Sequence, residues 1–104
     1  MNSTSHTGAA GELFAATKFL EMGFEVFRNI AASGPIDLML WHQETGSVCV
    51  DIKSIRNPYV KTDGTICFGQ KCGLRNDGVW QVIYVHGESC LRLPEGFPTP
   101  NNQF

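Results

Sequence analysis

The stretch Ser33-Gly-Pro-Ile-Asp37-Leu-Met-Leu-Trp41, followed closely by Ser47-Val-Cys-Val-Asp51-Ile-Lys53-Ser54, decides the fold. Two short apolar runs separated by a turn at residues 43–46 predict an antiparallel β-hairpin. Each run carries an aspartate where a core residue would be expected. Because side chains two residues apart in a strand share a face, Asp51 and Lys53 should point together.

The register of this hairpin decides whether its acidic side chains meet. A turn centred on Glu44 pairs residue 39 with residue 49 and sets Asp37 opposite Asp51. Side chains placed directly opposite have Cβ atoms about 4.5–5.5 Å apart, and like charges there repel. A cation between the two carboxylates would turn this repulsion into a binding site. A shift of one residue would put them on opposite faces.

The composition is that of a single globular domain. Of the 104 residues, 42% are hydrophobic and 17% are charged, which suffices for one core but not for two. We expect a flexible N-terminus over residues 1–7, one domain over residues 8–93, and a proline-rich C-terminal tail over residues 94–104.

Neither a membrane span nor a signal peptide is expected. No apolar run approaches the ~20 residues that cross a bilayer, and the N-terminus lacks a basic region followed by an apolar one. These features predict a cytoplasmic protein, which for a phage-encoded chain means the interior of the host cell.

Charge and cysteine usage narrow the function classes. The formal net charge of −2 argues against strong non-specific electrostatic binding to nucleic acid. DNA remains a candidate, because a bound divalent cation reverses the local sign. The four cysteines lack the C-x-x-C spacing of zinc sites and are expected to be reduced thiols. No serine has a matched histidine and acid for nucleophilic catalysis.

Helical periodicity predicts an α-helix over residues 8–22, with Thr7 as its N-cap. Its apolar stripe is formed by residues at 4-3-4 spacing, namely Ala9, Leu13, Ala16 and Leu20. Lys18 lies on the opposite side of the helix. Glu12 falls beside the stripe and has two interpretations. It is either a first-turn glutamate favoured by the helix dipole or a carboxylate that points toward the sheet.

Further strands are predicted by alternation and by turn residues, at 24–28, 66–68, 79–85 and 90–93. The last two should form a hairpin through the turn at Gly87-Glu88. One amphipathic helix before several short strands predicts an α/β fold, in which the N-terminal helix packs on a mixed central β-sheet.

Residues 55–76 show weak secondary-structure signals but hold half of all the lysines and arginines. The basic side chains are Arg56, Lys61, Lys71 and Arg75. A basic loop near an acidic site suits a polyanionic substrate, and Gln70 is a further candidate beside the site. For any one of these residues, the alternative is a solvated, irregular loop.

The acidic hairpin supplies what a metal-dependent phosphodiesterase needs. Hard divalent ions such as Mg²⁺ bind one or two carboxylates together with water and substrate phosphate, and Asp37 and Asp51 could be those carboxylates. Lys53 could orient or deprotonate the attacking water, or stabilise charge on the phosphate. Glu12 could be a third ligand, and the Ile52 carbonyl is available as a backbone one.

Three segments, in this order, resemble the PD-(D/E)XK nuclease superfamily. They are Gly11-Glu12, Ser33-Gly-Pro-Ile-Asp37-Leu and Val50-Asp51-Ile-Lys53-Ser54. Within the superfamily, the chain is most similar to small archaeal-type Holliday junction resolvases and to related phage and homing endonucleases. The likeness covers residues 8–54. Two departures are a proline two residues before Asp37 and an aspartate where glutamate is common.

The resemblance implies a restriction-endonuclease-like core and assigns roles within it. Asp37 and Asp51, with the Ile52 carbonyl, would bind Mg²⁺, for which Mn²⁺ would substitute. Lys53 would be the catalytic lysine and Glu12 an auxiliary ligand. Some members of the superfamily use a later glutamine, a role that Gln70 could take.

These observations lead to a principal hypothesis and to alternatives. The principal one is a Mg²⁺-dependent endonuclease that acts on branched or duplex DNA as a homodimer or tetramer. The alternative is a non-catalytic nucleic-acid-binding or assembly module that retains the nuclease fold. An RNA-directed nuclease would use the same residues.

Overall fold

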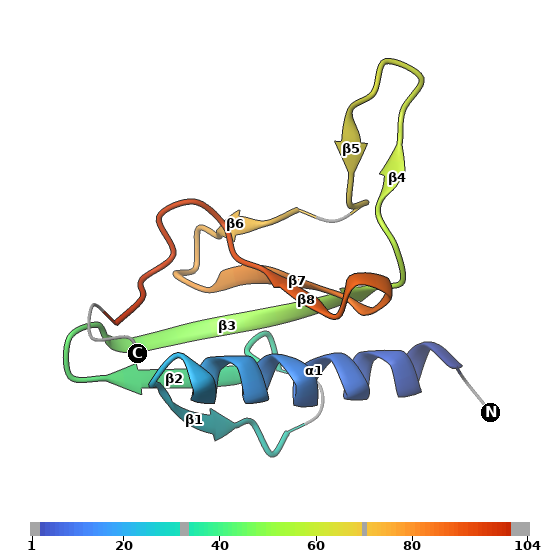
Figure 1. Ribbon diagram of the computed structural model, residues 1–104. Helices are drawn as coiled ribbons and strands as arrows, with labels where there is room; N and C mark the ends of the chain where they lie inside the picture. The colour runs from blue at the N-terminus through green and yellow to red at the C-terminus, as the bar shows by residue number, and fades with distance from the viewer. Residues whose placement is uncertain (1–2, 32–33, 70, 101–104) are drawn as a thin grey trace.

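The computed structural model describes residues 3–31, 34–69 and 71–100. A single helix packs on a mixed β-sheet of six strands, and a separate two-stranded hairpin projects from the body (Figure 1). The elements in chain order are α1 (Ser3–Glu21), β1 (Glu25–Arg28), β2 (Leu38–His42), β3 (Gly46–Ile55), β4 (Tyr59–Val60), β5 (Ile66–Cys67), β6 (Gly73–Leu74), β7 (Trp80–Val85), the 3₁₀ turn η1 (His86–Glu88) and β8 (Cys90–Arg92). The predicted α/β class, with an N-terminal helix on a mixed sheet, is confirmed.

The sheet combines antiparallel and parallel pairing. Strands β1, β2 and β3 run antiparallel in sequence order, and β3 then pairs in parallel with β7. The other edge of β7 is shared, because β6 pairs with its first half and β8 with its second half. Since parallel neighbours require a long connection, residues 56–79 cross from the end of β3 to the start of β7.

The predicted register of the β2–β3 hairpin is confirmed over Leu38–His42, with Met39 opposite Cys49, but the predicted pair of Asp37 and Asp51 is not part of the ladder. The ladder ends at the pair Leu38 and Val50. Just before it, the Asp37 N–H also donates to the Val50 carbonyl at 2.9 Å. Asp37 and Leu38 therefore both oppose Val50, as in a β-bulge, an irregularity common beside active sites.

The helix differs from the prediction at its start and in its buried face. It begins at Ser3, so Thr7 lies within it and is not its N-cap. Its fully buried residues include Ala15 and Phe19. The predicted apolar stripe is wrong, because Leu13 and Leu20 are 59% and 58% exposed.

The reason for this difference is how closely the helix approaches the sheet. A Cβ atom on the buried Gly11 would collide with the Ser54 Oγ of β3, so any side chain there would force Ser54 to move. One turn later Ala15 keeps the approach close, and Phe19 then fills the core. Contact distance, rather than hydrophobicity alone, selects the inward face.

The C-terminal tail belongs to the core, although its described part, residues 94–100, forms no helix or strand. The ring of Phe97 stacks on Phe19, with centroids 5.8 Å apart, and meets Trp80 edge-on at 5.4 Å. Pro100 is fully buried. Residues 101–104 of the predicted tail, like residues 1 and 2 of the predicted flexible N-terminus, lie outside the described residues.

The long connection between β3 and β7 contains two elements that the sequence did not predict. β4 follows directly after Pro58, and β6 occupies only two residues beside β7. The four cysteines are free thiols, as expected. Within the described ranges, no helix has the length and apolar character to cross a membrane.

Candidate active site

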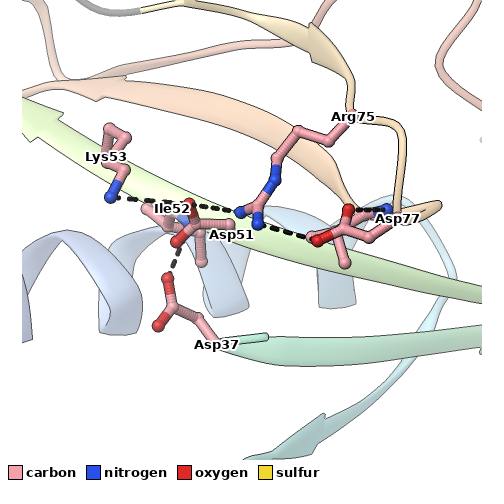
Figure 2. Close-up of polar contacts among 7 residues, drawn as sticks. Asp37, Asp51, Ile52, Lys53, Arg75 and Asp77 are labelled. Atoms are coloured by element: carbon pink, nitrogen blue, oxygen red, sulfur yellow. Dashed lines mark hydrogen bonds and ion pairs between the residues drawn. The ribbon is translucent and has the colours of Figure 1, made fainter. Parts of the chain in front are cut away.

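Asp37 lies at the point where β2 and β3 separate. Its Oδ2 accepts a hydrogen bond from the Ile52 N–H at 2.6 Å. That N–H has no backbone partner on β2, because the β2–β3 ladder ends at Val50 whereas β3 continues beyond that residue. The carboxylate thus completes the backbone hydrogen bonding of β3 at its free edge. This bond also fixes the side chain of Asp37 against β3 (Figure 2).

The environment of Asp37 favours the protonated carboxyl group. Burial, the largest cause, raises its pKa from 3.8 to about 6, and the hydrogen bond from Ile52 opposes this shift. A hydrogen-bond contact with Asp51 and the negative charges of Asp51 and Glu12 raise the pKa further. The carboxyl groups of Asp51 and Glu12 therefore both lie close enough to Asp37 to act on it.

Asp51 lies in the middle of β3 with only 12% of its side chain exposed. Its Oδ2 is 3.5 Å from the Lys53 Nζ and 3.4 Å from the Arg75 Nη1. The two cations approach it from different sides, while Asp37 approaches from the start of β2 (Figure 2). Lys53 and Asp51 share a face of the strand, as predicted. A nearly buried carboxylate is thus charge-compensated within the protein.

Arg75 is held over Asp51 by the tight turn before β7. Its Nη2 is 2.7 Å from Asp77 Oδ2, while Asp77 Oδ1 accepts the Val79 N–H at 3.1 Å. The Arg75 N–H also donates to the Val79 carbonyl at 2.9 Å. The sequence placed Arg75 in a general nucleic-acid-binding loop, whereas its guanidinium in fact contacts the carboxylate of Asp51.

Glu12 reaches the same region from the helix. It lines a cavity of about 360 Å³ together with Asp37 and Arg28. No acidic residue lies in the first helical turn, because the helix starts at Ser3. Glu12 is therefore not a helix-dipole residue, and it lines the same cavity as Asp37.

The donor set suits a hard divalent cation. Within residues 3–31, 34–69 and 71–100, no three His, Cys, Asp or Glu side chains converge closely enough to hold a metal ion. Two carboxyl groups do meet, and the Ile52 carbonyl points to the same side of β3 as its N–H, toward Asp37. Mg²⁺ needs only one or two carboxylates besides water and phosphate, so these residues fit it.

Gln81 is a site residue that the sequence analysis missed. It pairs with Asp51 across the parallel β3–β7 ladder, and partners in a ladder share a face of the sheet. It also lines a cavity of about 550 Å³ with Arg75 and Lys71. A polar residue in the otherwise apolar run 79–85 was the available signal, the same one that marked Asp51.

Among the described residues, the other predicted nucleic-acid-binding side chains make no ion pair with these carboxyl groups, although Lys71 lines the same cavity as Arg75 and Gln81. Arg56 and Lys61 are exposed on the connection that follows β3, and Lys71 is exposed near β6. Gln70 lies outside the described residues.

No protein-family model and no curated protein matches the sequence. A similar solved structure is that of a bacterial homing endonuclease, I-Ssp6803I, with a TM-score of 0.59. The two share a fold. The alignment covers 86% of this chain and 67% of the endonuclease, at 22% identity. The likeness therefore concerns the arrangement of helix and strands.

Proposed function

We propose that this protein is a Mg²⁺-dependent DNA endonuclease of the PD-(D/E)XK type. The observation that carries the proposal is the meeting of Asp37 and Asp51 where β2 and β3 separate, with Lys53 3.5 Å from Asp51. The similar fold of a homing endonuclease supports it.

The carboxyl groups of Asp37 and Asp51 and the Ile52 carbonyl would hold the Mg²⁺ ion, and Mn²⁺ would substitute for it. When bound, the ion neutralises phosphate charge and makes a coordinated water a better nucleophile. Glu12, which lines the same cavity as Asp37, would act as an auxiliary ligand, directly or through water.

Lys53 contributes a mobile cation beside these ligands. Its side chain is 43% exposed, so the ammonium group can reach a substrate phosphate while it stays on the active face of β3. It would orient or deprotonate the attacking water and donate hydrogen bonds to the phosphate oxygens, where negative charge builds up. Gln81, in the same row of the sheet as Asp51, lies where it could position that water or the phosphate.

Cleavage of two strands requires two active sites, which a symmetric dimer or tetramer would supply. A patch on the outer face of the β1–β2 pair supports such an assembly. It consists of the exposed side chains of Phe27, Met39 and Trp41, of which Phe27 and Met39 are direct cross-strand partners. Light scattering of the purified chain would measure the oligomeric state.

A cleavage assay tests the proposal directly. Purified protein is incubated with linear duplex DNA, a four-way junction, single-stranded DNA and RNA, with and without Mg²⁺. We expect Mg²⁺-dependent cutting of duplex or branched DNA. The variants Lys53→Ala and Asp37→Asn should lose activity by a factor of about 10² to 10⁴. Lys18→Ala, at an exposed lysine on α1, is the matched control and should retain it.

Full activity of either site variant would reject this mechanism, and activity on RNA alone would reassign the substrate. One observation favours the alternative of a non-catalytic binding module, namely that two protein cations already compensate Asp51. Calorimetric titration with Mn²⁺ separates the two hypotheses. A module without a metal site would show neither binding heat nor thermal stabilisation.

A further inference from the structure

The β4–β5 hairpin stands apart from the rest of the molecule. It forms its own two-stranded sheet, and Figure 1 shows it projecting from the end of β3, away from α1. Every residue from Tyr59 to Ile66 is exposed. Two-stranded hairpins are at best marginally stable alone in water, so a hairpin kept in this position is suited to contact with a partner.

The tip of the hairpin is nevertheless well ordered by its own hydrogen bonds. The Lys61 N–H donates to the Thr65 carbonyl at 2.8 Å, and the Gly64 N–H donates back to the Lys61 carbonyl at 2.9 Å. Gly64 adopts φ +90°, and the Asp63 Oδ1 accepts the Thr65 N–H at 2.9 Å. The only acidic side chain of the hairpin is thereby engaged within its turn.

The two faces of the hairpin differ in chemistry. Cross-strand pairing places Val60 beside Ile66 on one face, and they are 66% and 59% exposed. The other face carries Tyr59 together with the facing pair Lys61 and Thr65. An aromatic ring, an ammonium group and a hydroxyl are thus presented side by side.

The surrounding segment carries charge that complements a polyanion. The connection, residues 56–79, contains four basic residues and two acidic residues, a net charge of +2. Since the net charge of the whole chain is −2, the rest of the chain carries −4. The positive charge is therefore concentrated on the connection that bears the hairpin, directly after the strand that carries Asp51 and Lys53.

We propose that the β4–β5 hairpin is a sequence-reading ribbon that enters the major groove of DNA beside the cleaved phosphate, with Lys61 and Thr65 facing the base edges. This proposal rests on the proposed endonuclease function. The major groove is about 12 Å wide and accommodates a two-stranded ribbon. Lysine can donate hydrogen bonds to the O6 and N7 atoms of guanine. Threonine can form a hydrogen bond with an A·T or a G·C base pair, or contact the methyl group of thymine.

The distance along the chain agrees with a contact close to the cleaved bond. Lys61 follows Lys53 by eight residues, which in extended conformation span at most about 26 Å. That length corresponds to about eight base pairs at 3.4 Å each. The hairpin would thus read bases within about one helical turn of the scissile phosphate.

The test selects DNA bound by the full chain from a randomised duplex pool and sequences it. All proteins carry Lys53→Ala, so that binding is measured without cleavage. The test variant adds Lys61→Ala and Thr65→Ala, which leave the backbone hydrogen bonds of the turn in place. The control adds Lys71→Ala, at an exposed lysine of the same basic segment outside the hairpin. Circular dichroism verifies that each variant is folded.

We expect the test variant to lose about 5- to 150-fold of its discrimination at one or two adjacent positions of the selected sequence. The control should weaken binding to all sequences alike, as loss of a phosphate contact does. An unchanged base preference in the test variant, or a uniform loss like that of the control, would overturn the proposal. Absence of any DNA binding would overturn it together with the proposed function.

The two proposals remain distinguishable when DNA is bound. If the wild-type chain binds DNA with a hairpin-dependent base preference but cuts none of the substrates, the nuclease function fails and the reading role stands. If it cuts DNA with a preference that the hairpin variant leaves unchanged, the reading role fails and the nuclease function stands.

Discussion

At the scale of single residues, Asp51 is the carboxylate with which two cations of the site form ion pairs. Its Oδ2 is shared by Lys53 and Arg75, both between 3.4 and 3.5 Å away. A divalent cation that uses this carboxylate must compete with them, because all three favour the same negative charge. Arg75 is therefore expected to restrain metal binding and, once displaced, to become available to a DNA phosphate.

The variant Arg75→Ala tests this competition. We expect its affinity for Mn²⁺, measured by calorimetry without DNA, to rise several-fold, and its affinity for DNA to fall. Arg92→Ala is the matched control, because that arginine pairs with Glu88 at 2.8 Å rather than with an active-site carboxylate. Weaker binding of Mn²⁺ by Arg75→Ala would show instead that Arg75 organises the metal ligands.

The raised pKa of Asp37 predicts an unusual pH dependence of stability in the metal-free protein. A carboxyl group with a pKa of about 6 in the folded state and about 4 in the unfolded state binds more protons when folded. Its contribution to stability is thus present at low pH and is lost as the pH rises from about 4 to about 6. Asp37→Asn keeps an oxygen acceptor for Ile52 and should remove this loss.

We therefore expect Asp37→Asn to raise the melting temperature at pH 7 but not at pH 4. Asp63→Asn is the control, because the pH dependence of stability that comes from Asp63 should run in the opposite direction. Hydrogen bonds from Thr65 lower the pKa of Asp63, so its contribution to stability is lost on acidification. A lower melting temperature of Asp37→Asn at pH 7 would mean that the carboxylate of Asp37 stabilises the fold.

At the scale of elements, local patterns predicted those that depend on alternation. The strands at Glu25–Arg28, Leu38–His42 and Trp80–Val85 follow apolar runs closed by turn residues. The two-residue strands Tyr59–Val60 and Gly73–Leu74 could not be found in this way. They contain too few residues for a periodicity, and only their backbone pairing with β5 and with β7 defines them.

The inward face of α1 shows a second limit of sequence patterns. Hydrophobicity ranks Leu13 and Leu20 above Gly11 and Ala15, yet the small residues are buried, because the helix lies in close contact with β3. The spacing between helix and sheet is a tertiary property that periodicity does not contain. Because the stripe was misplaced, the sequence also could not decide between the two interpretations of Glu12.

Substitution at this contact should be costly. Gly11→Ala places a Cβ against Ser54 Oγ, and overpacking of this kind costs about 1–3 kcal/mol, against a gain of about 1 kcal/mol in helix propensity. We expect lower stability in urea denaturation, restored in part by Ser54→Ala in the same chain. Gly8→Ala is the control, since its Cβ meets nothing within 4 Å, and it should stabilise the protein. An equal gain from Gly11→Ala would contradict the close contact.

At the scale of the whole molecule, the part of the site that lies on neighbouring strands was predictable and the rest was not. Asp37, Asp51 and Lys53 come from one hairpin, whose register follows from a short turn. Arg75 and Gln81 reach Asp51 only because β7 returns alongside β3 after a long connection. No local pattern encodes the partner of a parallel strand, so these two neighbours had to be read from the fold.

The C-terminal tail should stabilise the whole molecule, because its side chains pack in the core against α1. Phe97 is buried between Phe19 and Trp80, and its replacement by alanine is expected to cost about 3–5 kcal/mol. Urea denaturation would measure this loss, and Thr99→Ala, at an exposed residue of the same tail, should change little. A loss below about 1 kcal/mol for Phe97→Ala would place the tail outside the cooperative unit.

The connection between β3 and β7 has a further consequence for how this fold can diversify. Closing a flexible loop costs free energy that grows only with the logarithm of its length, so that doubling residues 56–79 would cost about 0.6 kcal/mol. Asp51 and Lys53 lie on β3, before this connection begins, and Asp37 lies directly before β2, so none of the three belongs to the connection. Hairpins of other lengths and sequences could therefore be inserted there while Asp37, Asp51 and Lys53 keep their positions, which would let target preference change independently of the chemistry.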